Sequence, residues 1–153
     1  MYNAVLFLHS WIRWVVLVAG VLAIVRAFRG AGSGATFGPS DRRAGVIFVA
    51  SMDLQFLLGL LLYGVLSPIT SAAFQNFGAA MKDSVLRFFA VEHTMLALAA
   101  VVLAHIGSAR AKRAPSDRAR FRAMAIFFTI ALVLLLVAIP WPGRTMGRPL
   151  FRF

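Results

Sequence analysis

The chain alternates long apolar stretches with short segments rich in arginine, glycine and proline. A helix needs about 20 mainly apolar residues to cross the hydrocarbon core of a bilayer. Four stretches reach this length, at about residues 3–28, 43–66, 84–107 and 120–139. The pattern therefore predicts an all-α fold: a four-helix transmembrane bundle with up-down-up-down topology, forming one integral membrane domain over residues 1–153.

The breaks between these stretches carry residues that begin or end helices. A glycine- and serine-rich loop precedes Pro39, and Ser40 or Asp41 is expected to be the N-cap of the second helix. Residues 67–83 are only weakly polar and are expected to lie partly along the membrane surface. After the fourth stretch, residues 143–153 alternate arginine with apolar side chains, which predicts an interfacial anchor.

Composition favours a membrane protein over a soluble one. Apolar residues make up 61% of the chain, more than a small soluble domain can bury. The net charge of +11 would suggest nucleic-acid binding in a soluble protein. Here most arginines lie in two loops between apolar stretches, so we expect lipid headgroups as partners and no nucleic acid. The lack of cysteine excludes disulfides, iron–sulfur clusters and thiolate zinc sites.

The distribution of basic residues predicts the orientation. Positive residues concentrate in cytoplasmic loops, which assigns the first and third loops to the cytoplasm and both termini to the outside (N-out, C-out). The tail, which contains Arg144, Arg148 and Arg152, goes against this rule. The expected location is the inner (cytoplasmic) membrane of a bacterium. The basic residues near the two inner loops are Arg26, Arg29, Arg42, Arg43, Arg110, Lys112, Arg113, Arg118, Arg120 and Arg122.

The third stretch carries four polar groups that a simple membrane anchor would not need: Arg87, Glu92, His93 and His105. A charge at the bilayer centre costs about 2.5–3.5 kcal/mol on insertion scales, so it persists where it is paired or used. We expect this helix to face a polar interior. His105 lies near its inner end and is expected to cap lipid or backbone groups there.

Two histidines are expected at similar depth in the membrane. At about 1.5 Å per residue, His9 and His93 lie roughly 9 Å and 14 Å from the outer ends of their helices. Such a pair could bind a b-type haem iron through both axial positions. Gly20 is expected to leave room for the macrocycle. Arg87, Lys82 and the tail arginines are expected to neutralise the propionates. The alternative is that His9 is an interfacial polar residue and His93 a packed, hydrogen-bonded one.

Arg13 lies one turn below His9 and stays charged, so it must pair or reach water. We expect an ion-pair network of Arg13 with Glu92 or Asp53. This network either has a structural role alone, or binds a quinone headgroup or relays protons to it. Gln55 is a candidate hydrogen-bond partner for a cofactor, as is Tyr63 on the same helix face. Since no nucleophilic triad or phosphate loop is present, enzymatic activity is left undecided.

Four segments carry a resemblance to a known family: LHSWIRW at 8–14, LQFLLGLLLY at 54–63, MKDSVLRFFAVEH at 81–93 and IPWPGRTMGRPLFR at 139–152. They resemble small four-span bacterial membrane proteins that are often labelled cytochrome b-like. The resemblance implies haem binding. The family often has a histidine directly before the Leu-Gln of the second span, where this chain has Asp53. The site here then either uses His9 with His93 or has lost its haem.

Two functions follow as hypotheses. The first is a b-type cytochrome-like electron-transfer protein, with haem b between His9 and His93 and quinol as a possible electron partner. The second is a non-catalytic accessory subunit of a larger respiratory or photosynthetic membrane complex. In that case the buried polar residues would hold helices together, and the tail would contact a partner.

Overall fold

The computed structural model describes residues 1–151 and leaves Arg152 and Phe153 outside the described part. Within residues 1–151, four helices are long and apolar enough to cross a membrane, which confirms the predicted all-α four-helix bundle. Their bounds are α1 (Tyr2–Ser33), α2 (Pro39–Leu61) continued by the π-helix η1 (Leu62–Leu66), α5 (Ser84–Arg87) continued by the π-helix η2 (Phe88–Glu92) and α6 (His93–Arg113), and α7 (Asp117–Ala138).

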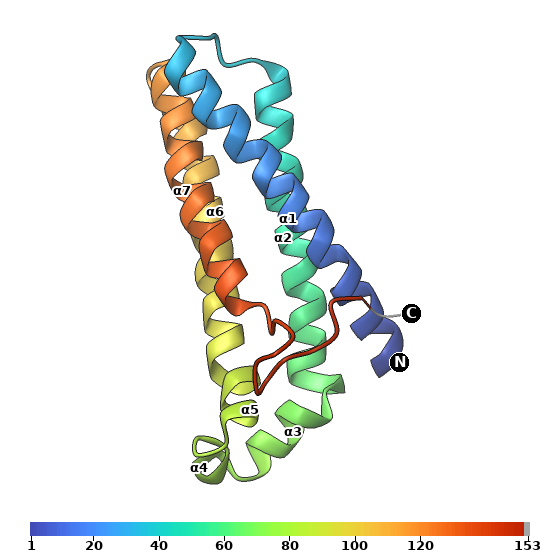
Figure 1. The fold of residues 1–153 in the computed structure, drawn as a ribbon. Coiled ribbons are helices and arrows are strands. Elements are labelled where there is room, and N and C mark those ends of the chain that lie inside the picture. The colour runs from blue at the N-terminus through green and yellow to red at the C-terminus, as the bar shows by residue number, and fades with distance from the viewer. Residues whose placement is uncertain (152–153) are drawn as a thin grey trace.

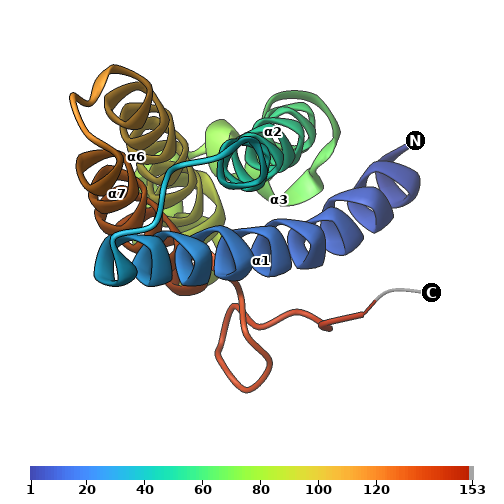
Figure 2. The same cartoon turned by 90° about the horizontal axis from the view of Figure 1, so that it is seen from above.

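The long helices run antiparallel to their neighbours in the chain (Figure 1). Helix α6 packs along α7, and α1 packs against both α2 and α7, whereas α2 and α6 touch less extensively. Viewed along the bundle, α1 crosses the front, with α6 and α7 on one side and α2 behind (Figure 2). The short helices α3 (Pro68–Gln75) and α4 (Phe77–Ala80) connect α2 to α5.

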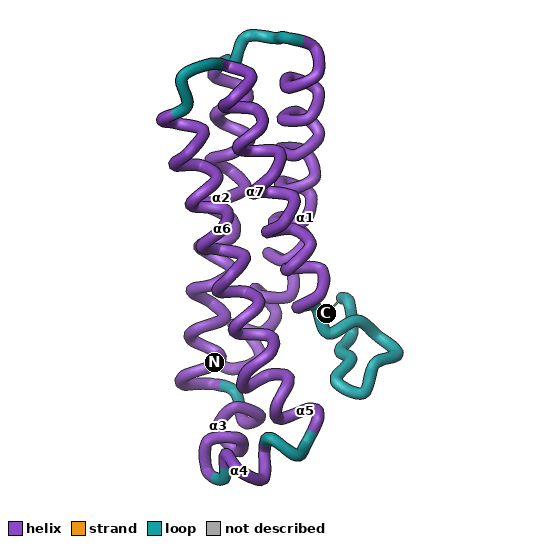
Figure 3. The backbone as a smooth tube through the Cα atoms, turned by 90° about the vertical axis from the view of Figure 1, so that its left-hand side faces the viewer, coloured by secondary structure: helices purple, strands orange, loops and turns teal. Residues whose placement is uncertain are grey.

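The two ends of the bundle differ in composition. Figure 3 shows loops at both ends and the C-terminal segment beside the bundle. We call the end with the loops at 34–38 and 114–116 the basic end, because the ten basic residues of the predicted inner loops gather there. The opposite end, which carries α3, α4 and residues 139–151, is called the tail end.

The core fills the half of the bundle nearer the basic end with aromatic rings set against small residues. Phe48 and Phe128 are fully buried, and their ring centroids lie 5.1 Å apart. A Cβ added to Gly20 would lie 2.8 Å from Phe48 Cε2, so this glycine lets α1 approach α2. Most of the large exposed side chains along the four long helices are apolar, as a bilayer requires.

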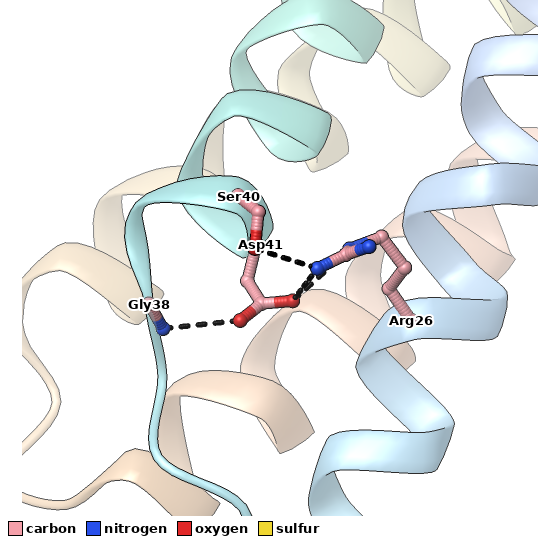
Figure 4. A network of polar contacts seen from close by, with 4 residues as sticks. All are labelled: Arg26, Gly38, Ser40 and Asp41. Carbon is pink, nitrogen blue, oxygen red and sulfur yellow. Dashed lines mark hydrogen bonds and ion pairs between the residues drawn. The ribbon is translucent and has the colours of Figure 1, made fainter.

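Helix α2 begins at Pro39, two or three residues earlier than the predicted N-cap implies, and its N-cap is Gly38. The predicted N-cap, Ser40 or Asp41, is therefore wrong in position. Asp41 still satisfies the helix start, because its Oδ2 accepts a hydrogen bond from Gly38 N at 3.0 Å. Its Oδ1 pairs with Arg26 Nη2 at 2.8 Å, which ties α1 to α2 at the basic end (Figure 4).

The tail returns along α1 and contacts it directly. Trp14 Nε1 donates to the Leu150 carbonyl at 3.3 Å, and Arg13 Nη2 donates to the same oxygen. Phe151 stacks on Trp14, with centroids 5.3 Å apart and an interplanar angle of 11°. The segment predicted to be an interfacial anchor thus also packs on the bundle.

Candidate functional site

His9 of α1 and His93 of α6 face each other in the tail-end half of the bundle. Their ring centroids are 6.3 Å apart and their planes meet at 63°. Two imidazoles that bind one metal ion, each through a nitrogen at about 2 Å, also have centroids roughly 6 Å apart. The matched depth inferred from the sequence therefore corresponds to real proximity, although their role as haem ligands stays a prediction.

Helix α7 orients His93 through its last carbonyl. His93 Nδ1 lies 2.8 Å from the carbonyl oxygen of Ala138. Since a carbonyl only accepts hydrogen bonds, Nδ1 carries the proton and Nε2 keeps its lone pair. Metal-binding histidines are oriented in this way by a backbone acceptor on the other ring nitrogen.

The end of α7 explains why that carbonyl is available. In a continued helix, the amides of residues 140 and 142 would donate to the carbonyls of Leu136 and Ala138. Both positions are proline, which has no N–H. Instead, Trp141 Nε1 donates to the carbonyl oxygen of Leu136 at 2.8 Å, and His93 Nδ1 donates to the carbonyl oxygen of Ala138.

The ring of His9 rests against α2 at Gly59. A Cβ on Gly59 would lie 3.3 Å from His9 Cε1, which is closer than nearly all Cβ contacts. The main chain of Gln55 is also near the ring. Within the described residues, however, His9 Nδ1 and Gln55 Oε1 are buried side-chain atoms without a hydrogen bond of good geometry. Gln55 Oε1 therefore has bonding capacity left for another group.

A cavity opens between the two histidines and extends from the tail end to the middle of the bundle. Its volume is about 170 Å³, and its wall is mainly apolar. All four long helices and the tail contribute to its wall. The residues used below are His9, Arg13, Met52, Gln55, Gly59, Tyr63, His93, Ala97, Val101, Ala138 and Arg148.

Arg13 and Arg148 supply positive charge to this cavity. Arg148 lies over the ring of Phe89, with its guanidinium carbon 5.1 Å from the centroid. Arg13 comes from α1 and Arg148 from the tail, so the folded-back tail completes the wall. Of the tail arginines expected near the propionates, Arg148 is the one that lines the cavity within the described residues.

The predicted network of Arg13 with Glu92 or Asp53 is wrong. Glu92 Oε1 pairs with Arg87 Nε at 2.8 Å, and Asp53 Oδ1 pairs with His105 Nε2 at 2.8 Å. Arg87 and Glu92 are five residues apart, which in an α-helix would separate them by about 140°. The π-helix η2 between them brings them to one side. Arg87 is thus occupied by Glu92, and neither residue lines the cavity.

The other predicted cofactor contacts have different outcomes. Gly20 is a packing position against Phe48 and does not line the cavity, so its predicted role beside a macrocycle is contradicted. Gln55 does line the cavity. Tyr63 lines it as well, but its hydroxyl donates to the Ala90 carbonyl at 2.8 Å and so holds η2 in place. Ala97 is the small residue that leaves room beside His93.

The donor set fits haem better than a protein-only metal site. Among residues 1–151, no group of three or more His, Cys, Asp or Glu side chains is placed to hold a metal ion. Two facing histidines in an apolar cavity suit a metal whose remaining ligands come from a macrocycle. Comparison of the chain with protein-family models, curated proteins and solved structures finds no match. The site must therefore be interpreted from its own geometry.

Proposed function

We propose that this protein is a b-type cytochrome-like electron-transfer protein that holds haem b between His9 and His93. The observation that carries the proposal is the pair of imidazoles 6.3 Å apart across an apolar cavity, one of them held with its Nε2 unprotonated by a helix-terminal carbonyl. When bound, the haem would supply reversible one-electron transfer.

The residues around the histidines have distinct tasks in this proposal. Ala138 fixes the tautomer and orientation of His93, and Gly59 gives the His9 ring its space. Arg13 and Arg148 replace Arg87 as the proposed partners of the propionates, because both line the cavity. The apolar wall excludes water and helps set the redox potential.

The proposed setting is the inner membrane of a bacterium, with the basic end in the cytoplasm. A membrane quinol is the proposed electron partner, since it would reach the bundle through the lipid.

A reduced-minus-oxidised absorption spectrum of the detergent-purified protein tests the proposal. A b-type α-band with about one haem per chain is expected. A featureless spectrum from well-folded protein would overturn the proposal and favour the second hypothesis, an accessory subunit. That hypothesis has its own test, which is co-purification of a stable larger membrane complex with no cofactor held by this chain.

A further inference from the structure

A second polar site lies outside the His9–His93 cavity, on the outer surface of the bundle. Asp53 of α2 and His105 of α6 are joined across the α2–α6 interface, with His105 Nε2 and Asp53 Oδ1 2.8 Å apart. This interface is less extensive than those of α6 with α7 and of α1 with α2. The two side chains are 40% and 53% exposed, respectively. Their exposed neighbours on the same helices are apolar: Leu54, Leu57, Val102 and Ile106.

This pair lies nearer the middle of the bundle than the basic residues of the same two helices. Asp53 is ten residues from Arg43 and His105 five residues from Arg110, the nearest basic residues toward the basic end on each helix. At about 1.5 Å per residue, these separations are roughly 15 Å and 8 Å. A phospholipid headgroup stays at the level of the arginines, so a ligand of this pair must bring its polar group into the hydrocarbon layer.

Both side chains keep hydrogen-bonding capacity. In the described part of the chain, each of the two side chains makes a single hydrogen bond, which is the bond to the other. Asp53 Oδ2 and His105 Nδ1 are therefore available. Ionisable residues in membrane helices almost always face the bundle interior. This pair instead faces outward, with 40% of the Asp53 and 53% of the His105 side chain exposed.

We propose that the Asp53–His105 pair binds the headgroup of a membrane quinone or quinol. Such a headgroup is uncharged and dissolves in the hydrocarbon layer. The hydroxyl groups of a quinol can donate to Asp53 Oδ2 and to His105 Nδ1, and a quinone carbonyl can accept from Nδ1–H when His105 is an imidazolium. Its apolar tail would lie on the leucine, valine and isoleucine side chains beside the pair. Charged lipid headgroups do not meet these conditions at this depth.

The site adjoins the histidine cavity. Met52, directly before Asp53, and Val101, one turn before His105, both line that cavity. A quinol headgroup at the pair would therefore be separated from the cavity by little more than one layer of side chains. The choice of a quinone over other neutral headgroups rests on the proposed electron-transfer function, whereas the position of the site rests on the pair alone.

The test is photolabelling of the purified protein in lipid nanodiscs with an azido-benzoquinone that carries a short alkyl tail, followed by peptide mapping. Labelling is expected on α2 and α6 near Asp53 and His105. The double variant Asp53→Leu/His105→Leu removes both partners together, so neither is left unpaired. It is expected to lower labelling at this site at least tenfold. Ser51→Ala, a polar change on the same helix, is the matched control and should leave labelling unchanged.

Two further arms separate the possible failures. His9→Ala/His93→Ala should keep full labelling, because the pair stands outside the cavity, and labelling can be measured whether or not haem is bound. Equal labelling of wild type and the Leu/Leu variant would overturn the inference, even if haem were present. A lower melting temperature of the Leu/Leu variant with unchanged labelling would show that the pair only stabilises the contact between α2 and α6, which also overturns the inference. A dimer that needs the pair would show that a second copy occupies the surface, which also overturns it.

Discussion

The Nδ1 atom of His93 lies 2.8 Å from the carbonyl oxygen of Ala138, the last residue of α7. This contact joins the third and fourth membrane helices and leaves Nε2 of the same ring free to bind a ligand. It exists because prolines at 140 and 142 cannot donate to the end of α7. One short motif thus ends a helix and orients a candidate haem ligand.

The double variant Pro140→Ala/Pro142→Ala restores two backbone donors at this helix end. We expect α7 to extend and its new amides to compete with His93 for the Ala138 carbonyl. Loss of an outer hydrogen bond to a metal-binding histidine typically costs about 10–100-fold in metal affinity, so haem retention should fall by that order. The measurement is the rate of haem transfer to apomyoglobin. Pro115→Ala, in the exposed loop at the basic end, is the control, and equal rates for both variants would contradict this role of the prolines.

Gly59→Ala tests whether the space beside His9 is needed. The added methyl group would lie 3.3 Å from His9 Cε1, so the ring must shift or tilt. Haem content per chain should fall, while the melting temperature changes little. Gly64→Ala is the matched control because a Cβ there meets nothing within 4 Å. Full haem content in both variants would show that His9 tolerates displacement and is not a tightly held ligand.

Gly20→Ala separates packing from cofactor binding. A Cβ at this position would lie 2.8 Å from Phe48 Cε2, and overpacking of a well-filled core typically costs about 1–3 kcal/mol. We expect a lower melting temperature with an unchanged visible spectrum in the protein that remains folded. Gly32→Ala, where nothing lies within 4 Å, should melt like wild type. A spectral change without loss of stability would restore Gly20 to the haem site.

Arg148→Gln removes a positive charge from the cavity wall. Because that charge favours the reduced haem, which carries one positive charge less than the oxidised form, its removal should lower the midpoint potential. Redox titration measures the effect. Arg144→Gln, an exposed position on the same tail, should leave the potential near the wild-type value. A drop of equal size in both variants would indicate a general surface-charge effect.

The sequence was sufficient to predict the four membrane helices and the meeting of His9 with His93, because helix length and depth follow directly from counting residues. It was not sufficient for side-chain partners. The π-helix η2 brings Arg87 and Glu92 to the same side of the helix. A projection that assumes a regular α-helix places them on different sides, so it cannot predict this ion pair. The partner of Arg13 at Leu150 and the pairing of Asp53 with His105 depend on tertiary contacts between distant segments.

The most direct test of the central claim compares the three single variants His9→Ala, His93→Ala and His105→Ala by reduced-minus-oxidised spectroscopy of the purified proteins. The structure places the first two histidines at the cavity and the third outside it. The α-band should be lost or shifted to a five-coordinate form in His9→Ala and His93→Ala and should persist in His105→Ala. A normal six-coordinate b-type spectrum in either of the first two variants would contradict bis-histidine ligation by His9 and His93.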